Sequence, residues 1–404
     1  MNNMMPKNNQ MGLKVLQERK PYILPCSNAS GLFSSEEWRN TRMGIPVMLG
    51  KAADGTVRMM DLAEAPHLLG AGATGSGKAA FTRQLFQSLL LRFSPDELKL
   101  LLIDPYARNF APYEKVPHLV APVLTDPEKV TAAFQWACKE MNRRFQWLAA
   151  AAVRDIHCYN NRTPSVEARC GREGNPIPDR MPYLVIVIGE FADLDIDTIE
   201  EVICQLAMKS RAVGIHIVAL TECMSEDILP GVLKYCFPLR FAFRGADKGD
   251  SLATLEQEGA ELLRGKGDML YSTGANTCGR IQCGYASSDE IALVVNACAI
   301  QREAEFDEAL MKMLNAGMQE KSKEQESPDC SQLSEEELIQ RALAVIATTK
   351  RPTISCLQRR LHIAFIQSDA LLEKLEELGY VGPQGIERPR EIHWDKFPHD
   401  IVSM

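Results

Sequence analysis

PHLLGAGATGSGKAAF, residues 66–81, is the stretch that decides the fold of this 404-residue chain. A short apolar run leads into a segment with three glycines and a lysine, and leucines recur at helical spacing in residues 79–92. Glycine lets consecutive backbone N–H groups crowd around an anion, and the following helix turns its positive N-terminus toward the same point. The stretch therefore predicts a strand, a phosphate-binding loop and a helix. The expected nucleotide-binding residues are Gly72, Ala73, Thr74, Gly75, Ser76, Gly77, Lys78 and Ala79.

One position departs from the phosphate-binding pattern G-x-x-x-x-G-K-[ST]. The last residue of that pattern carries a hydroxyl that coordinates Mg²⁺, whereas this chain has Ala79 there. Lys78, which places a positive charge on the outer phosphates, is retained. We therefore expect binding of a nucleotide's phosphates with a weakened or lost magnesium site.

Beyond this loop, residues 46–312 alternate apolar strands with helices. Strands are expected at 45–50, 56–62, 98–103, 183–188, 214–220 and 237–243, and long helices at 127–152 and 196–212. Such alternation predicts an α/β fold, a doubly wound and mostly parallel sheet that binds its ligand at the carboxyl ends of the strands.

The strand at 183–188 ends in a second candidate motif. Strands of this kind usually end in an aspartate that helps to hold magnesium, followed in many ring motors by a glutamate that orients the attacking water. Here the two positions are Gly189 and Glu190. Glu190 is the candidate catalytic acid, although a strand-end carboxylate can equally have a structural role. No metal ligand of the protein is predicted.

The C-terminal part differs in composition from the α/β part. Residues 313–333 have the charged, polar composition of a linker. Ser334 and Glu337 form a capping box before a helix to residue 348, and helices at 355–361 and 367–378 follow. Tyr380-Val381 and residues 391–394 flank a turn. Three helices and a β wing in 334–404 predict a winged helix, a variant of the helix-turn-helix DNA-binding fold.

Bulk composition restricts the remaining possibilities. No apolar run reaches the roughly 18 residues of a membrane span, and the N-terminus lacks a secretory pattern, so we expect a cytoplasmic protein without a membrane span. Residues 1–45 are polar and predict a flexible lead-in. The 12 cysteines form no CxxC pair, which argues against a zinc site or a disulfide framework. A net charge of −8 does not indicate a surface coated for nucleic acid, although a ring can carry basic groups on its inner wall.

The chain resembles the FtsK/SpoIIIE family of DNA translocases from about residue 46 to residue 394. The resemblance rests on PHLLGAGATGSGK (66–78), IDPYARNFAPYEKVPHL (103–119), EMNRRF (140–145), GEFADL (189–194), KSRAVGIHIV (209–218), GDSLATLEQEGAELLRGKGDMLY (249–271), ISCLQRRLHIAF (354–365) and PREI (389–392). It implies a RecA-like P-loop ATPase that assembles as a hexameric ring around double-stranded DNA, followed by a winged helix that reads polar sequences. It also implies that Glu190 is the catalytic acid and that Arg211 reaches a neighbour's nucleotide.

Several positions differ from the family pattern. The family has Ser or Thr at position 79, Asp at 189, and Thr-Gln-Arg-Pro where this chain has TECM at 221–224. The substitutions at 79 and 189 both remove ligands of the same magnesium ion, and neither needs to disturb the fold. Hydrolysis is therefore expected to be at least about a hundredfold slower than in an intact site. The expected recognition helix, counted over residues 367–378, has one lysine against four acids and a net charge of −3, which disfavours phosphate contact. The remaining candidates for DNA contact are Arg359, Arg360, Arg388 and Arg390.

Three functions remain open from the sequence. The first is a DNA translocase for chromosome or element segregation, with its unusual motif residues compensated elsewhere or with impaired hydrolysis. The second is a nucleotide-binding, poorly hydrolysing regulatory or assembly subunit in a mixed ring with an intact translocase. The third is a coupling ATPase of a conjugative or secretion system.

Overall fold

A computed structural model describes most of the chain. The described residues are 29–105, 107, 109–162, 177–222, 231–273, 278–321, 335–349, 352, 357, 361, 365–382 and 392–398. The chain divides into two compact units, Met1–Gln319 and Glu320–Met404. Each unit is described by itself.

The described part of the first unit is organised around a nine-stranded sheet with the order β2-β1-β9-β8-β7-β3-β6-β5-β4. Its strands are β1 (Pro46–Ala52), β2 (Val57–Asp61), β3 (His67–Ala71), β4 (Leu98–Ile103), β5 (Tyr183–Ile188), β6 (Ile215–Thr221), β7 (Leu239–Phe243), β8 (Asp268–Ser272) and β9 (Cys278–Gln282). The five strands from β7 to β4 are parallel, and the other four extend the sheet in antiparallel fashion. The carboxyl ends of β3, β5 and β6 therefore meet at one edge, where a doubly wound sheet binds its ligand.

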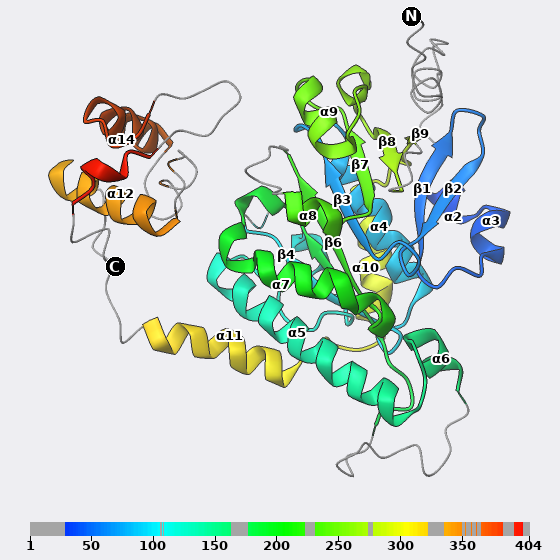
Figure 1. The fold of residues 1–404 in the computed structure, drawn as a ribbon. Helices are drawn as coiled ribbons and strands as arrows, with labels where there is room; N and C mark the ends of the chain where they lie inside the picture. Colours follow the sequence, from blue (N-terminus) through cyan, green and yellow to red (C-terminus); the bar gives the residue numbers. More distant parts are fainter. Residues whose placement is uncertain are drawn as a thin grey trace, which may run out of the picture. The chain divides into compact units, whose positions relative to one another are not determined.

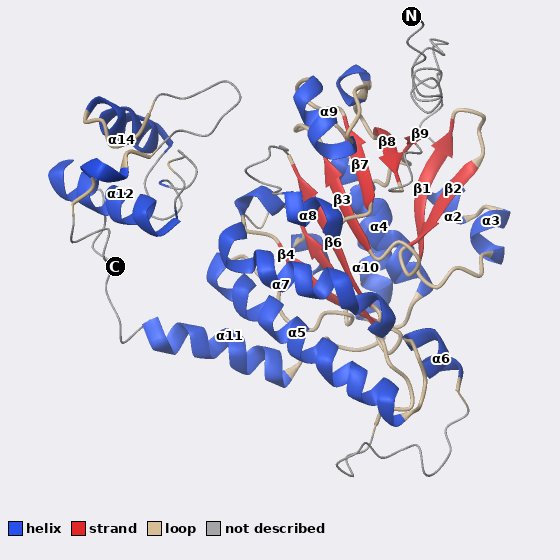
Figure 2. Cartoon of the chain, in the orientation of Figure 1, coloured by secondary structure: helices blue, strands red, loops and turns tan. Residues whose placement is uncertain are grey.

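Helices cover both faces of this sheet (Figures 1 and 2). One face packs against α5 (Pro127–Ala150) and α7 (Ile196–Lys209), and the other packs against α4 (Lys78–Arg92) and α10 (Ser288–Ala299). Successive side chains of a strand point to opposite faces. On β5, Leu184, Ile186 and Ile188 accordingly join the first core, while Val185 and Val187 join the second.

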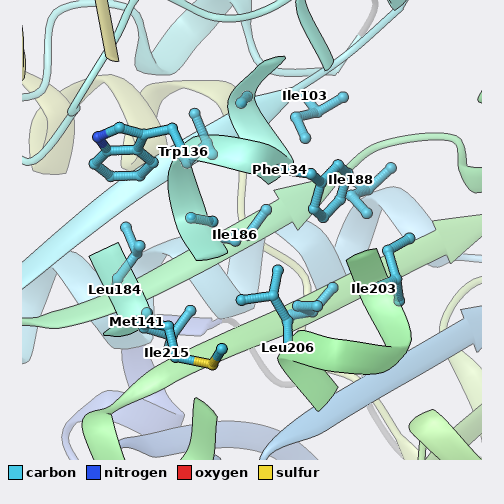
Figure 3. Close-up of a cluster of buried hydrophobic side chains, with 14 of the residues drawn as sticks. Ile103, Phe134, Trp136, Met141, Leu184, Ile186, Ile188, Ile203, Leu206 and Ile215 are labelled. Carbon is cyan, nitrogen blue, oxygen red and sulfur yellow. The ribbon is translucent and has the colours of Figure 1, made fainter. Parts of the chain in front are cut away.

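The first core shows why these strands read as continuous apolar runs. In Figure 3, Phe134 and Met141 of α5 lie with Ile186 of β5 and Leu206 of α7. All four side chains are fully buried. A parallel strand covered by helices on both faces has no solvent side, so alternation with polar residues is absent.

Most expected elements of this unit are confirmed, and β4 and β5 begin and end at the predicted residues. The pair β8 and β9 was missed because both strands are short and carry polar residues. Two boundaries of the predicted organisation are corrected. Residues 29–40 contain two helices, α2 (Ala29–Phe33) and α3 (Glu36–Asn40), because Leu32 and Trp38 pack on Met48.

The predicted linker begins in a helix. The helix α11 (Glu308–Lys321) extends past residue 313, because Leu310 and Leu314 are buried in the first core. The remaining described helices are α6 (Ile156–Asn161), α8 (Gly231–Cys236) and α9 (Lys248–Leu255). Within the described ranges, none of the helices has the length and apolar character that crossing a bilayer requires.

The second unit contains α12 (Glu335–Thr349), α14 (Phe365–Glu377) and a short 3-10 helix, Trp394–Lys396. Its core includes Leu343 and Ile346 of α12 together with Leu371 and Leu375 of α14. An antiparallel bridge joins Val381 to Ile392, as the predicted wing requires. The expected helix at 355–361 lies mostly outside the described residues.

Candidate functional site

The glycine loop connects β3 to α4 and has a shape that only glycine permits at its end. Gly77, which precedes the first residue of α4, has a φ of 114°. A Cβ atom on Gly77 would lie 1.9 Å from the backbone nitrogen of Gly267. That nitrogen donates a hydrogen bond to the carbonyl of Ser76 at 2.9 Å. The close approach of two backbones therefore requires glycine at position 77.

Neighbouring strands hold the loop in place. The N–H of Gly72 donates to the carbonyl of Thr221 at 3.2 Å, and the N–H of Ala73 donates to the carbonyl of Arg244 at 2.9 Å. Thr221 is the last residue of β6 and Arg244 comes directly after β7, and these two strands flank β3. The first turn of α4 leaves N–H groups without intrahelical partners, and Gly77 provides no side-chain cap. The loop is thus preorganised for an anion before one binds.

Lys78 is the first residue of α4, where the loop ends, and its charge is largely withdrawn from water. Its side chain is 13% exposed, and its Nζ lies 3.9 Å from Oε2 of Glu190 and 3.8 Å from Oε1 of Glu222. Both distances exceed those of a hydrogen bond, and Nζ has no hydrogen-bond partner among the described residues. Burial lowers the pKa of Lys78, and the two carboxylates oppose this shift. A buried ammonium with unused donors is suited to bind phosphate oxygens.

Glu190 is positioned by the end of β6. Its Oε1 accepts a hydrogen bond from the hydroxyl of Thr221, and the backbone N–H of Glu222 approaches Oε1 at 2.9 Å and Oε2 at 3.0 Å. Because β6 lies between β3 and β5, these contacts place the carboxylate beside Lys78. The structure thus brings together two residues that the sequence motifs indicated. It adds Thr221 and Glu222, to which the sequence gave no role beyond marking TECM (221–224) as a departure from the family pattern.

The two positions expected to hold magnesium carry no side-chain oxygen. Ala79 is exposed in the first turn of α4, and Gly189 is buried at the end of β5. A Cβ atom on Gly189 would lie 3.2 Å from Nδ2 of Asn109, 3.3 Å from Cζ of Phe110 and 3.4 Å from Oδ1 of Asp104. Neighbouring side chains therefore pack closely around Gly189 and leave little room for a larger residue. Among the described residues, no group of three or more His, Cys, Asp or Glu side chains can hold a metal ion. Ala79 and Gly189 therefore offer no side-chain ligand to a magnesium ion.

Arg211 is not brought to this site within the chain. It lies in the turn Ser210–Val213 that precedes β6, whereas Thr221 is the last residue of that strand. At about 3.3 Å per residue, a strand of this length separates the two by roughly 20 Å. The guanidinium of Arg211 is half exposed and forms an ion pair with Glu64 at 2.6 Å. Arg211 therefore occupies the opposite edge of the sheet from Lys78.

The candidate DNA-binding residues Arg359, Arg360, Arg388 and Arg390 lie outside the described residues. The helix α14, which the sequence analysis expects to be the recognition helix, has one basic residue, Lys374, which forms an ion pair with Glu377 at 3.1 Å. Its described surface thus retains the acidic character read from the sequence.

A glycine loop between a parallel strand and a helix, with a buried lysine and a strand-end glutamate, defines a RecA-like P-loop NTPase fold. Comparison with known proteins agrees. A profile of the FtsK/SpoIIIE family matches residues 30–226, and a profile of the FtsK gamma domain, a winged helix, matches residues 334–395. The solved cytoplasmic domain of the type VII secretion ATPase EccC from Thermomonospora curvata has a TM-score of 0.56 over 73% of this chain and 34% of that one. At 24% identity, that likeness shows the fold alone.

Curated relatives extend the match over nearly the whole chain. The DNA translocase FtsK of Haemophilus influenzae is 34% identical over 369 residues, which cover 87% of this chain and 69% of that protein. The DNA translocase FtsK of Borreliella burgdorferi is 36% identical over 395 residues, which cover 96% of this chain and 47% of that protein. The chain belongs to the FtsK/SpoIIIE family. It spans about half the length of several curated relatives that it matches.

Proposed function

We propose that the chain is the ATP-binding motor of a DNA translocase that acts on double-stranded DNA, works in the cytoplasm and hydrolyses ATP slowly. The observation that carries this proposal is the buried ammonium of Lys78 at the head of a preorganised glycine loop. Its Nζ has no hydrogen-bond partner among the described residues, and two carboxylates at 3.8 and 3.9 Å, beyond hydrogen-bond reach, balance its charge. Phosphate oxygens would satisfy these donors.

Each chemical role has a residue in a suitable place. The loop residues 72–78 and Ala79 would bind the phosphates through backbone N–H groups and the ammonium. Glu190, held by Thr221 and the N–H of Glu222, would orient the attacking water. Its hydrogen bonds come from a neighbouring strand, so the carboxylate is oriented before nucleotide arrives.

Arg211 would act on the nucleotide of a neighbouring subunit. Its position at the far edge of the sheet argues against a role in its own site. Its guanidinium is 53% exposed and pairs with the exposed Glu64, an ion pair that a neighbouring subunit would replace. This arrangement supports assembly as a homo-hexamer or as a mixed ring with an intact translocase. The arginines at 359, 360, 388 and 390 would contact the DNA backbone.

Slow turnover is expected because Ala79 and Gly189 have no side-chain oxygen to bind a metal ion. A metal ion normally contributes several kcal/mol to stabilising transition-state charge, and roughly every 1.4 kcal/mol changes the rate tenfold. Ala79 and Gly189 offer no side-chain ligand through which the protein would supply this contribution. The same observation favours a second function, a nucleotide-binding subunit that regulates or assembles a mixed ring.

The test is steady-state ATPase activity with and without long duplex DNA, measured beside nucleotide affinity on the same preparation. We expect ATP binding with weak, DNA-stimulated turnover. A DNA-stimulated rate of order 1 per second or faster would refute slow hydrolysis. Binding without any turnover would favour the regulatory subunit, and absence of binding would refute both functions.

A further inference from the structure

Two cysteine thiols from different helices are in contact in the first unit. Cys204 belongs to α7 and Cys236 is the last residue of α8, and these two helices lie side by side (Figure 1). The S–H of Cys236 donates a hydrogen bond to Sγ of Cys204, and the two sulfur atoms are 3.4 Å apart. Both side chains are thiols in the structure. Because the sulfur atoms of a disulfide are about 2.05 Å apart, an approach of about 1.4 Å would join them.

The two thiols differ in their access to solvent. Cys204 is half-buried, and it lies one turn from Met208, which is 81% exposed, on the same face of α7. Cys236 is 8% exposed. Burial raises the pKa of its thiol to about 12, and Cys204 and the carboxylate of Glu200 add to this shift. Cys236 therefore stays protonated and donates its hydrogen to Cys204, and a small oxidant from solvent reaches Cys204 first.

We propose that Cys204 and Cys236 form an oxidation-sensitive dithiol, which hydrogen peroxide converts to a disulfide that joins α7 to α8. Sγ of Cys204, after loss of its proton, attacks one oxygen of the peroxide and the O–O bond breaks. The second oxygen leaves as hydroxide, which takes up that proton and becomes water. The sulfur of Cys236 then attacks the sulfur of the sulfenic acid, and the hydroxyl leaves with the Cys236 proton as a second water. The two sulfur atoms are thereby oxidised, and the peroxide is reduced to water.

This disulfide would join the helices that follow the two carboxylates near Lys78. The helix α7 is the first α-helix after Glu190, and α8 is the first described helix after Glu222. A bond between residues 204 and 236 would close the intervening chain, which includes the whole of β6, into a loop and restrict the unfolded state. The oxidised chain should therefore be harder to unfold. The inference is independent of the proposed function, because it requires no nucleotide.

The experiment maps the disulfide in the folded full chain. The wild type is treated with hydrogen peroxide, the remaining thiols are blocked with N-ethylmaleimide, and the chain is digested with trypsin for mass spectrometry. Cleavage after lysine and arginine places Cys204 in the peptide 181–209 and Cys236 in the peptide 235–240. Neither peptide contains another cysteine, so a linked pair of these peptides identifies this disulfide alone.

Two serine variants receive the same treatment. Cys204→Ser removes the thiol that is expected to react first. The matched control is Cys138→Ser, because Cys138 also contacts α7, with its Sγ 3.9 Å from the carbonyl oxygen of Val202 and 3.7 Å from Oε1 of Gln205. All three chains meet the same peroxide, so oxidation of methionine affects them alike. Melting temperatures are measured for each chain before and after oxidation.

We expect one dominant linked pair, Cys204 with Cys236, which dithiothreitol separates again, and a rise in melting temperature on oxidation of about 3–10 °C. Cys138→Ser should show both effects and Cys204→Ser neither. In urea the other cysteines compete, because the cost of loop closure depends weakly on loop length, so the share of Cys204 linked to Cys236 should fall at least about threefold.

Three results would overturn the proposal. The first is absence of the linked pair in the folded wild type at peroxide concentrations that oxidise other cysteines. The second is an equal share of the linked pair in folded and urea-treated chain, since the contact between the two sulfur atoms would then have no influence. The third is an equal change in melting temperature in the wild type and Cys204→Ser, because the disulfide would then place no restraint on the chain.

Discussion

Replacing Glu222 by Gln should strengthen nucleotide binding. The Glu222 carboxylate lies 3.8 Å from Nζ of Lys78, the side chain that must bind the phosphates. Two unit charges at this distance interact by about 1 kcal/mol in water and about 4 kcal/mol at an effective dielectric constant near 20. Because the Glu222 side chain is 53% exposed, solvent screens the pair and the lower value applies. Removal of the negative charge also reduces repulsion of the incoming phosphates.

We therefore expect Glu222→Gln to lower the Kd for ATP by about two- to fivefold, or up to about 1 kcal/mol. Calorimetric titration in EDTA at low salt measures this effect, and the gain should shrink at 0.5 M salt because exposed charges are screened. Glu256→Gln is the matched control, since Glu256 is also an exposed partner in an ion pair, at 2.8 Å from Arg240, and lies outside the site. Weaker binding by Glu222→Gln would show that Glu222 helps to position Lys78. An equal gain from both variants would show that net charge, and not the site, is responsible.

Four further predictions follow from the same geometry. Lys78→Met should abolish the rise in melting temperature that ATP produces in the wild type, because the central donor is lost; an unchanged rise would contradict phosphate binding at this loop. Ala79→Ser should make ATP affinity and turnover more dependent on Mg²⁺, with turnover up about tenfold. Gly189→Asp alone should lower the free energy of unfolding by about 1–3 kcal/mol in urea titrations, since its Cβ meets Asn109 and Phe110 within 3.3 Å. Gly189→Ala separates the steric effect from the added charge beside Asp104, and a fully stable Gly189→Asp would refute the close packing. Arg211→Ala should preserve ATP affinity and reduce any DNA-stimulated turnover by about a thousandfold, with Arg154→Ala, another exposed arginine, as control; loss of ATP affinity would place Arg211 in its own site.

Several features of the fold could be read from the sequence because they depend on local patterns. The buried strands β4 and β5 are continuous apolar runs bounded by polar residues, and both were predicted to the residue. The glycine loop was equally readable, since its spacing of glycine and lysine has a direct backbone meaning. The antiparallel strands β8 and β9 were not, because they are stabilised by pairing with β7 and β1 and not by their own hydrophobic pattern.

The features of the site likewise divide into those that the sequence determined and those that only the tertiary structure decided. The residue types at positions 78, 79, 189 and 190 decided which chemical groups are present and which are missing, and no structure was needed to know that Ala79 and Gly189 lack a metal ligand. The tertiary structure decided what surrounds them: Glu222 beside Lys78, Asp104 beside Gly189, and Arg211 at the opposite edge of the sheet. These relations join residues from different strands. Their distances depend on strand order and crossover connections, and these are properties of the whole sheet that no local stretch of sequence contains.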